Sequence, residues 1–555
     1  MSIAGFCGTK KLNLKAMVLL SVVAYGLVVT TGCATSSNDF YNEYWTKSSP
    51  VEQTSFVTDS RDWYGDSYKL GYHVDLAMSQ LRQRRTDEAS KSLQAADDVI
   101  DEHFKKDYAG LITSFTLSET SSDYVGDPYE QVQIPMLRSL IFAQEKNWEK
   151  SLAMARRTND TIQTIVQKLA KVHGFEVDST QSSTRSKSSS NKKKALKWHY
   201  VKDAFAYYVA SAAAYNQRDY ENALSHARNS VLTYTSPVYK NNYLVKKTPE
   251  NVAKLYCHLA KTIDQGPVRD IDKSLVDENC AGVEPMDTSK GEAVVVVLHG
   301  RGATKQSLNV DLVLDKKLVD KLVAGAAVPL FQAFTESDKE SSDGKTAGKD
   351  VSAGKTNKVF GVLMGLVLAD PYINDQIALQ VDDLTKKGSK GFGSGVANAV
   401  GALSDDVMRL SVPVYLWYPT SKPPQTVSLG ENAASSRQSL SLVSNLDGIR
   451  DRELFDTMNM SMLRSISRGF FRLALAEGAG KAGGFWAKLG VGAVTKTAES
   501  SETRSLRALP QSIYTISTSL KEGTYPLSGN GISFAAEQLK VEANKINFVI
   551  AYSGT

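Results

Sequence analysis

The spacing of hydrophobic residues changes near residue 265 and divides the chain into a helical part and a mixed part. From about residue 61 to residue 264, apolar residues recur every three or four positions, which is typical of amphipathic helices. Residues 292–299 (EAVVVVLH) instead form a β-branched run before a glycine turn, which predicts a buried strand. Further strands are predicted at 412–418, 512–520 and 546–552, and a long helix at 450–477. The pattern therefore predicts an all-α domain followed by a mixed α/β domain.

A short motif repeats in the helical part and indicates that its helices form hairpins. WEKSLAMAR at 148–156 aligns with YENALSHAR at 220–228, and a weaker copy surrounds Ala89. An aromatic residue followed by small residues lets a second helix pack closely against a first, as in tetratricopeptide-like hairpins. First helices are predicted at 129–144 and 203–216, before the two clear copies. Because the spacing is not that of a strict array of roughly 34-residue repeats, we predict divergent hairpins, with an ordinary helical bundle as the alternative.

The N-terminus has the features of an export signal. Residues 1–15 contain three lysines and no acidic residue, and an apolar run follows at 16–29. Gly32 directly before Cys33 matches the lipobox of bacterial lipoproteins, in which the chain is cut before the cysteine and the cysteine is diacylated, although Thr30 stands where Leu, Val or Ile is usual. The alternative is an uncleaved anchor helix, which is disfavoured because the run is shorter than the ~20 residues that a spanning helix needs.

This leader predicts where the protein is located. Two acyl chains on Cys33 would hold it stably on a bilayer, and Ala34 follows the cysteine instead of an aspartate. We therefore expect a lipid-anchored, periplasm-facing protein of the outer membrane, with exposure on the cell surface as the alternative. Cys7 would leave with the leader, so Cys257 and Cys280 remain as a candidate disulfide pair in an oxidising compartment, with two unpaired thiols as the alternative.

Composition divides the chain further. The predicted units are a signal peptide 1–32, a flexible tether 33–60, a helical-hairpin domain 61–264 with a polar insertion 179–194, a connector 265–290, and an α/β domain 291–555 with a polar loop 336–357. Hydrophobic residues make up 42% and charged residues 23%, as in soluble globular proteins. The formal charge of +5 falls to 5 − 3 = +2 without the leader lysines, so no nucleic-acid partner is expected.

Three candidate catalytic motifs lack residues that their chemistry needs. His299-Gly300-Arg301-Gly302 resembles the oxyanion turn of an α/β-hydrolase, but no histidine follows it, and the serine at 391–395 (GFGSG) is out of register. The GKT triplets at 344–346 and 354–356 lack the first glycine of a P-loop. Zinc-ligand spacing is also missing from the sequence. We therefore predict no enzyme, no cofactor and no metal site.

Several short motifs carry a family resemblance. They are Pro128-Tyr129-Glu130, Asp203-Ala204-Phe205, Gly291-Glu292 before the valine strand, Glu502-Thr503-Arg504-Ser505, and Leu509-Pro510. Together with the lipobox, their order resembles an uncharacterised family of bacterial tetratricopeptide-like lipoproteins. The resemblance implies a location in the cell envelope and supplies no catalytic residues. Arg504, with Glu502 and Glu477 as candidate partners, is expected to fix a loop rather than bind a ligand.

These features predict an outer-membrane scaffold or adaptor. Its helical hairpins would form a concave surface that binds another envelope protein. The alternatives are a structural component of an envelope ring or secretion assembly, or a glycan-acting enzyme whose carboxylates the sequence does not identify.

Overall fold

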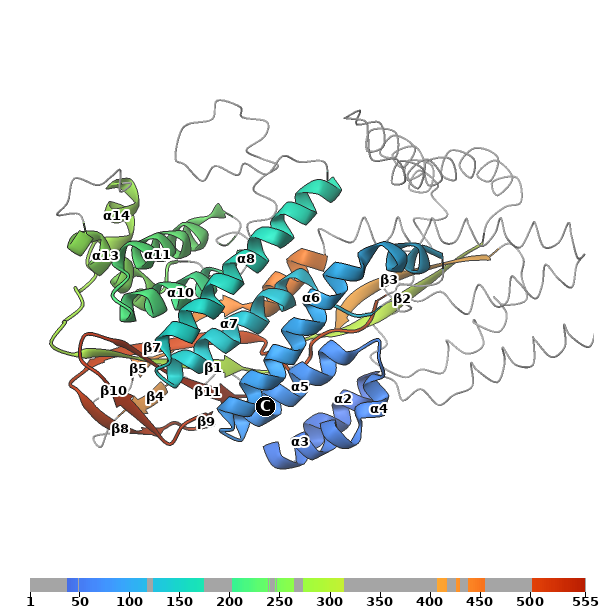
Figure 1. Ribbon diagram of the computed structural model, residues 1–555, viewed down its shortest axis with the longest axis horizontal. Coiled ribbons are helices and arrows are strands. Elements are labelled where there is room, and N and C mark those ends of the chain that lie inside the picture. Colours follow the sequence, from blue (N-terminus) through green and yellow to red (C-terminus); the bar gives the residue numbers. More distant parts are fainter. Residues whose placement is uncertain are drawn as a thin grey trace, which may run out of the picture.

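The computed structural model describes residues 37–47, 49–116, 123–173, 202–237, 239, 245, 247–263, 273–313, 407–416, 426–429, 438–454 and 502–554. They form a mixed helix-plus-sheet fold, in which the helices lie along one side of the strands (Figure 1). The leader 1–32, the insertion 179–194 and the polar loop 336–357 lie outside the described residues. Within the described part of the chain, no helix is both long enough and apolar enough to cross a membrane.

Eight helices pair in four successive hairpins. The pairs are α5 (Lys69–Arg82) with α6 (Thr86–Thr116), α7 (Pro128–Gln144) with α8 (Trp148–His173), α10 (Ala204–Asn216) with α11 (Tyr220–Thr235), and α13 (Glu250–Ile263) with α14 (Lys273–Cys280). The second helix of each of the first three pairs also contacts the first helix of the next pair. The hairpins therefore form one continuous stack, and both clear copies of the sequence motif begin a second helix.

The first three hairpins turn in the same way. Arg84, Lys146 and Arg218 have φ angles of 64°, 61° and 63°. The amide of the residue after each one donates to a carbonyl five residues earlier, as in Asn147 to Phe142 at 2.8 Å. A left-handed residue with this hydrogen bond ends a helix abruptly and reverses the chain. This shared turn brings each second helix back along the first.

A five-stranded sheet has the strand order β6-β7-β1-β11-β9. It combines β1, the first strand after the helices, with strands from the C-terminal part of the chain. Their bounds are β6 (Ser441–Asn445), β7 (Ser512–Leu520), β1 (Gly291–His299), β11 (Ile546–Ser553) and β9 (Ile532–Phe534). β1 runs parallel to β11 and antiparallel to β7. The strands predicted at 292–299, 512–520 and 546–552 thus lie side by side at the centre of the sheet.

Further strands form two smaller sheets. A four-stranded sheet has the order β10 (Gln538–Val541), β8 (Gly523–Ser528), β4 (Thr426–Leu429) and β5 (Gln438–Ser439). A two-stranded sheet pairs β2 (Thr304–Val313) with β3 (Val407–Leu416), which contains part of the strand predicted at 412–418. Residues 446–454 are helical, and the rest of the helix predicted at 450–477 lies outside the described residues.

The valine run of β1 is buried on both faces. Val294 and Val296 belong to the core that the sheet shares with the helices. Val295 and Val297 belong to a second core, which includes Val427 of the four-stranded sheet. A strand covered on both faces needs a continuous apolar run rather than an alternating one. The helical and α/β parts therefore share one hydrophobic core across the predicted domain boundary.

In the second and third hairpins, the first helix lies between the second helix and the sheet. Every residue of α10 is buried, and both α7 and α10 contact β11. The second helices α6, α8 and α11 keep an exposed side, for example at Lys91, Ala153 and Ser225. The inner helices α7 and α10 are therefore covered by the protein's own sheet.

The last residue of the first helix in each of the first three hairpins contacts β11. Asn216 donates through Nδ2 to the carbonyl of Ile546 and accepts from its amide, both at 2.8 Å. Gln144 accepts the amide of Ile550 at 2.7 Å. The guanidinium carbon of Arg82 lies 5.7 Å from the ring centre of Tyr552. Equivalent positions in three hairpins thus contact successive points along one strand.

Asn216→Ala should lower the free energy of unfolding by about 2 kcal/mol, because it leaves the buried amide and carbonyl of Ile546 without partners. Gln217→Ala alters the exposed neighbouring side chain and should cost less than about 0.5 kcal/mol. Urea unfolding of both variants tests this prediction. Equal stability of the two variants would contradict the docking role of Asn216.

The prediction of a flexible tether at 33–60 is wrong for residues 37–59. Three short helices form there and continue to residue 64: α2 (Ser37–Thr46), α3 (Pro50–Asp59) and α4 (Arg61–Tyr64). Phe40, Tyr41 and Tyr44 of α2 are buried in the main core. These aromatic residues recur at helical spacing and bury enough surface to order a segment otherwise rich in Ser, Thr and Asn. The predicted connector at 265–290 likewise contains a helix, α14.

Candidate functional site

A network of buried or partly buried ionisable side chains, here called the polar junction, connects the helices to the loop before β7. It comprises Tyr41, Tyr64, Tyr68, Asp75, Tyr124, Asp127, Tyr129, Glu130, Lys305, Tyr415, Asp447, Arg450, Glu453, Glu502, Arg504 and Arg507. These residues come from α2, α4, α5, α7, β2, β3, the helical segment 446–454 and residues 502–509, and Tyr68, Tyr124 and Asp127 lie in the loops before α5 and α7. Two of the short sequence motifs, Pro128-Tyr129-Glu130 and Glu502–Ser505, meet in it.

Glu130 is the central acceptor of the polar junction, and it is fully buried. Its carboxylate accepts from the Tyr124 hydroxyl at 2.5 Å, the Tyr129 hydroxyl at 2.9 Å, the Asp127 amide at 2.9 Å and the Leu506 amide at 2.7 Å. Asp127 and Glu130 form a capping box at the start of α7. Burial raises the pKa of Glu130, and the Asp127 carboxylate adds to this effect. The same carboxylate therefore begins α7 and holds the loop before β7.

Lys305 supplies the opposite charge. Its ammonium lies 2.7 Å from Oδ1 of Asp127, whose Oδ2 accepts from the Tyr415 hydroxyl at 3.1 Å. Lys305 and Tyr415 face each other on paired positions of β2 and β3. Glu453 accepts the backbone amide of Tyr129 at 3.3 Å, and burial raises its pKa. The two-stranded sheet is thus tied to the N-terminus of α7.

Arg450 is almost completely buried and links the helical segment 446–454 to α7. Its Nη1 donates to Asp447 at 2.7 Å and its Nε donates to the Tyr129 hydroxyl at 2.5 Å. A Cβ on Gly302 would lie 2.6 Å from Nη2 of Arg450. A side chain at position 302 would therefore push the guanidinium away from its present position.

Asp75 anchors the other end of the junction. It accepts from the Tyr41 hydroxyl at 2.7 Å and from the Tyr64 hydroxyl at 2.8 Å. Burial raises the pKa of Asp75 to about 6, although both hydrogen bonds and Arg507 oppose the rise. Tyr68 donates to the carbonyl of Ser505 at 2.6 Å. The aromatic helices α2 and α4 are thereby connected to the same loop that Glu130 holds.

The geometry of the junction favours a structural role. Its acids accept hydrogen bonds from side chains and backbone amides of the same chain, and Lys305, Arg450 and Arg504 each contact one of these acids, as buried charges require. Arg504 pairs with Glu502 at 2.6 Å and donates to the carbonyl of Ser67 at 2.8 Å, which fixes the loop as the sequence predicts. Glu477, the other candidate partner of Arg504, lies outside the described residues. Among the described residues, no cluster of three His, Cys, Asp or Glu side chains is arranged to hold a metal ion.

Sequence reasoning did not identify Asp75, Glu130, Lys305 or Arg450 as members of one site. Two of them carry local signals. Glu130 follows Asp127 by three residues before an apolar run, which is the pattern of a capping box. Asp75 is the one acid in the otherwise largely apolar segment 70–81. Their partners in the loop before β7 follow hundreds of residues later, so no local pattern connects them.

His299 lies at the C-terminal end of β1 and is buried. Its Nδ1 is 2.9 Å from Oγ of Ser553, at the end of the parallel strand β11. Gly300 follows with a φ of 71°. The HGRG motif is thus a turn at the end of the sheet. The GFGSG segment and both GKT triplets lie outside the described residues.

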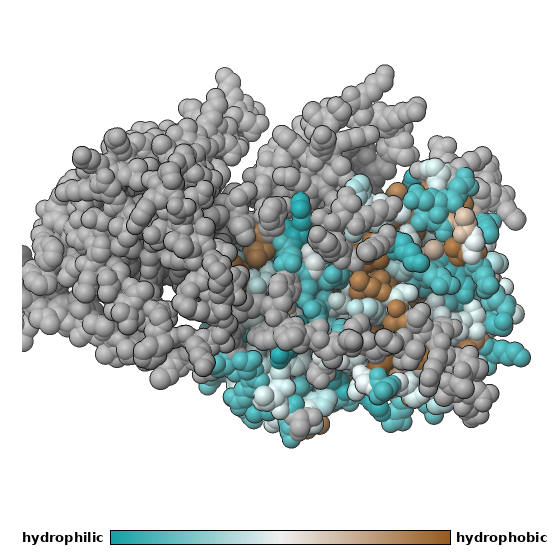
Figure 2. Space-filling view, turned by 180° about the vertical axis from the view of Figure 1, so that it is seen from behind, coloured by the Kyte–Doolittle hydropathy of each residue, from teal (hydrophilic) through white to brown (hydrophobic). Residues whose placement is uncertain are grey.

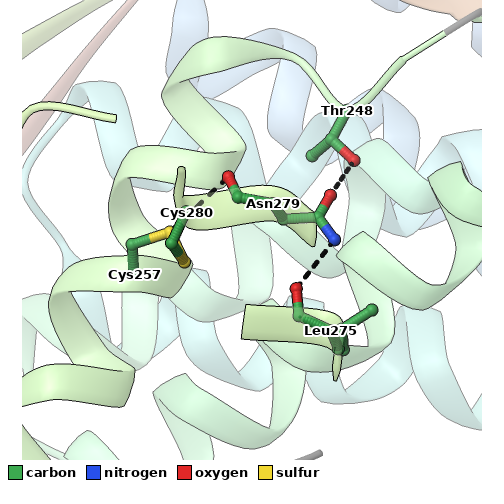
Figure 3. The surroundings of a disulfide bond; sticks show 5 residues. All are labelled: Thr248, Cys257, Leu275, Asn279 and Cys280. Carbon is green, nitrogen blue, oxygen red and sulfur yellow. Dashed lines mark hydrogen bonds between the residues drawn. A yellow bond between two sulfur atoms is a disulfide. The ribbon is translucent and has the colours of Figure 1, made fainter. Parts of the chain in front are cut away.

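The predicted lipidation site, Gly32 and Cys33, also lies outside the described residues. Cys257 of α13 and Cys280 at the end of α14 are joined by a disulfide, with their Cα atoms 5.6 Å apart (Figure 3). Beside it, Asn279 accepts from the Thr248 hydroxyl at 2.8 Å and donates to the Leu275 carbonyl at 2.9 Å. The disulfide therefore fastens the last hairpin at the end of the stack.

Replacing both Cys257 and Cys280 by alanine should allow α14 to detach from the rest of the protein without global unfolding. Closure of a loop of this length corresponds to about 3 kcal/mol when both ends belong to one cooperative unit. Leu275 is the main buried apolar side chain of α14, so this helix can detach alone and the global loss should stay near 1 kcal/mol. Limited proteolysis should cut residues 273–280 much faster than in the oxidised protein. A global loss of about 3 kcal/mol without faster cleavage would contradict local detachment.

Ion pairs connect the outer helices. Arg157 of α8 contacts Asp97 of α6 at 3.2 Å and Asp101 at 2.5 Å, and Arg156 lies 3.9 Å from Asp219, the N-cap of α11. Seen from behind, the described surface is also mostly hydrophilic, with smaller hydrophobic areas (Figure 2). Of the described large hydrophobic side chains, Val51 and Leu232 are exposed, by 64% and 40%. The exposed side chains of the outer helices are therefore mostly polar, with Leu232 of α11 as an exception.

Comparison with known proteins identifies no relative. No protein family model matches the chain, and neither a curated protein nor a solved structure matches it.

Proposed function

We propose that the protein is a lipid-anchored scaffold or adaptor of the outer membrane, which binds another envelope protein through tetratricopeptide-like hairpins. Two observations support export to an oxidising compartment: the sequence Thr30–Cys33 after an apolar leader, and the disulfide between Cys257 and Cys280. The similar turns and packing of the hairpins support the tetratricopeptide-like description.

The covered inner face of the stack is the observation that determines the proposed binding surface. Since α7 and α10 pack against β11, a partner meets the outer helices α6, α8 and α11. The middle helix, α8, exposes Glu149, Lys150, Ala153 and Arg156. A surface of this composition favours a partner with complementary charges, because charge complementarity guides docking between polar surfaces. This replaces the concave surface that the sequence predicts.

Photo-crosslinking in the native host tests the proposal. Benzoylphenylalanine at Ala153, exposed on α8, should form a covalent adduct with a second envelope protein. The same residue at Thr524, exposed on β8 of the four-stranded sheet, is the control and should give none. Adducts at neither position would overturn the adaptor function. Adducts formed only with copies of the same chain would favour the ring or assembly component instead.

Lipidation is tested separately. Mass spectrometry of the purified protein should find a diacyl adduct on an N-terminal Cys33, and Cys33→Ala should prevent palmitate labelling. An intact N-terminus at Met1 without lipid would overturn the proposed location.

A further inference from the structure

The lipid anchor and the folded body are separated by very little chain. α2 begins at Ser37, and Phe40 is already buried in the main core. Four residue steps join Cys33 to Ser37, and a fully extended chain spans roughly 3.5 Å per residue, so the link reaches about 14 Å at most. A lipid on Cys33 would therefore hold the body close to the bilayer.

Resting on the proposed lipidation, we propose that α2, α3 and α4, here called the N-terminal cap, lie against a zwitterionic phospholipid surface and fix the orientation of the whole protein. The three helices form the face from which the acylated chain would emerge. The partner is the bilayer that carries the anchor.

Contact of the N-terminal cap with the bilayer would orient the whole protein, because hydrogen bonds join the cap to the first hairpin. Gln83 donates to the carbonyl of Pro50 at 2.8 Å, and Thr54 donates to Ser79 at 2.8 Å. Arg82 donates to Gln53 at 3.1 Å. With Phe40, Tyr41 and Tyr44 buried in the shared core, the cap is part of the folded body rather than an independent arm.

The surface chemistry of the cap suits the headgroup region. Trp45 and Trp63 are only partly buried, and cations lie over neighbouring aromatic rings. These pairs are Lys47 over Phe56 at 4.8 Å, Arg61 over Tyr72 at 5.6 Å and Arg82 over Trp45 at 4.8 Å. Val51 of α3 is the more exposed of the two large hydrophobic side chains on the described surface. Tryptophan, tyrosine, lysine and arginine are the residues that collect at membrane interfaces.

The charge of the cap argues against an anionic lipid surface. Residues 37–64 contain five acidic residues, Asp39, Glu43, Glu52, Asp59 and Asp62, and two basic ones, Lys47 and Arg61, so the net charge is 2 − 5 = −3. Basic clusters are what attract a protein to anionic lipid. The short link and the aromatic surface, and not charge, would therefore hold the cap close to the bilayer. Both are compatible with a zwitterionic lipid surface.

This placement gives the hairpin stack a direction. The cap lies beside α5 at one end of the helical stack, whereas α13 and α14 form the other end (Figure 1). Successive hairpins therefore lead away from the membrane. A partner docked on the outer helices would be held at a distance from the bilayer that the hairpin it contacts determines.

Spin labelling of the acylated full-length protein in phosphatidylcholine vesicles tests the orientation. A nitroxide is attached to Ser55→Cys, exposed on α3, or to Ser225→Cys, exposed on α11. Vesicles carry a small fraction of nickel-chelating lipid, which relaxes nearby nitroxides. Relaxation at position 55 should be several-fold stronger than at position 225. Inserting a Gly/Ser linker of about 25 residues after Ala34 adds roughly 25 Å of root-mean-square reach and should remove most of this difference.

Each outcome bears on the proposal. Equal relaxation at positions 55 and 225 would overturn it, whereas a difference that persists after the insertion would show that the surface of the cap holds it at the bilayer without the short link. Replacing part of the phosphatidylcholine with phosphatidylglycerol should leave the relaxation at position 55 unchanged. A several-fold increase would overturn the zwitterionic surface. Mass spectrometry of the same sample separates the two proposals: lipidated protein without a difference refutes the orientation alone, whereas missing lipid refutes the anchored function and the orientation with it.

Discussion

Glu130→Ala should lower the free energy of unfolding by about 4 kcal/mol or more and should be among the most damaging changes in the helical part. Alanine removes an acceptor that four donors share: the hydroxyls of Tyr124 and Tyr129 and the amides of Asp127 and Leu506. Each buried donor left without a partner costs about 1–3 kcal/mol. Equilibrium urea unfolding, followed by far-UV circular dichroism, measures the loss.

Glu130→Gln separates the effect of losing hydrogen-bond acceptors from the effect of losing side-chain volume. The amide keeps one oxygen acceptor, for the Tyr129 hydroxyl and the Leu506 amide, but it presents an NH₂ group to the Tyr124 hydroxyl and the Asp127 amide. About half of the alanine effect should therefore remain. The control is Glu537→Ala, which breaks an exposed ion pair with Arg84 and should cost less than about 0.5 kcal/mol. Equal effects of Glu130→Ala and Glu537→Ala would refute the central role of Glu130.

Local patterns were sufficient to predict the central strands and the hairpins. The valine run of β1 carries its own signal, because a strand buried on both faces needs apolar residues without interruption. The Ser512–Leu520 strand matches β7, and the repeated small residues at 151 and 223 begin the close helix packing. Ser139 donates to the carbonyl of Ser151, and Ser211 donates to that of Ala223, both at 2.8 Å. These features depend on neighbours within about a dozen residues.

Composition misled the prediction where few residues decide the structure. Ser, Thr and Asn dominate residues 34–59 and favoured a flexible tether. Three aromatic residues at 40, 41 and 44 nevertheless order α2, because each buries a large apolar ring. The average composition of the segment indicates a tether, whereas the spacing of its aromatic residues indicates a helix.

The polar junction could not be predicted, because its contacts cross the whole chain. Leu506 donates to Glu130 across 376 residues, and Tyr68 donates to Ser505 across 437. In the sequence, Glu130 has only the pattern of an ordinary helix-capping residue, because its partner Leu506 lies so far along the chain. The covering of the inner helices could not be predicted from the sequence either. The hairpin spacing predicts a stack of helix pairs with two sides, but it does not indicate which side packs against the strands that follow later in the chain.

Asp75→Asn should change how stability depends on pH. Burial raises the pKa of Asp75 from its usual value of 3.8 to about 6 in the folded protein. The folded state therefore binds the proton more tightly than the unfolded chain, so this group stabilises the fold below pH 3.8, and the contribution is lost as the pH rises to 6. A shift of about two units corresponds to about 3 kcal/mol.

Asparagine carries no titrating proton, so the stability of Asp75→Asn relative to wild type should rise by about 2.5 kcal/mol between pH 4 and pH 7.5. Any constant cost of the amide, which still accepts from Tyr41 and Tyr64, cancels in this difference. Asp62→Asn, at an exposed position of α4, controls for the loss of one negative charge. Urea unfolding of the three proteins at several pH values measures the effect. Parallel pH profiles for wild type and Asp75→Asn would show that this carboxyl group titrates alike in the folded and unfolded chains, and the tyrosine cluster around it would then not exclude water.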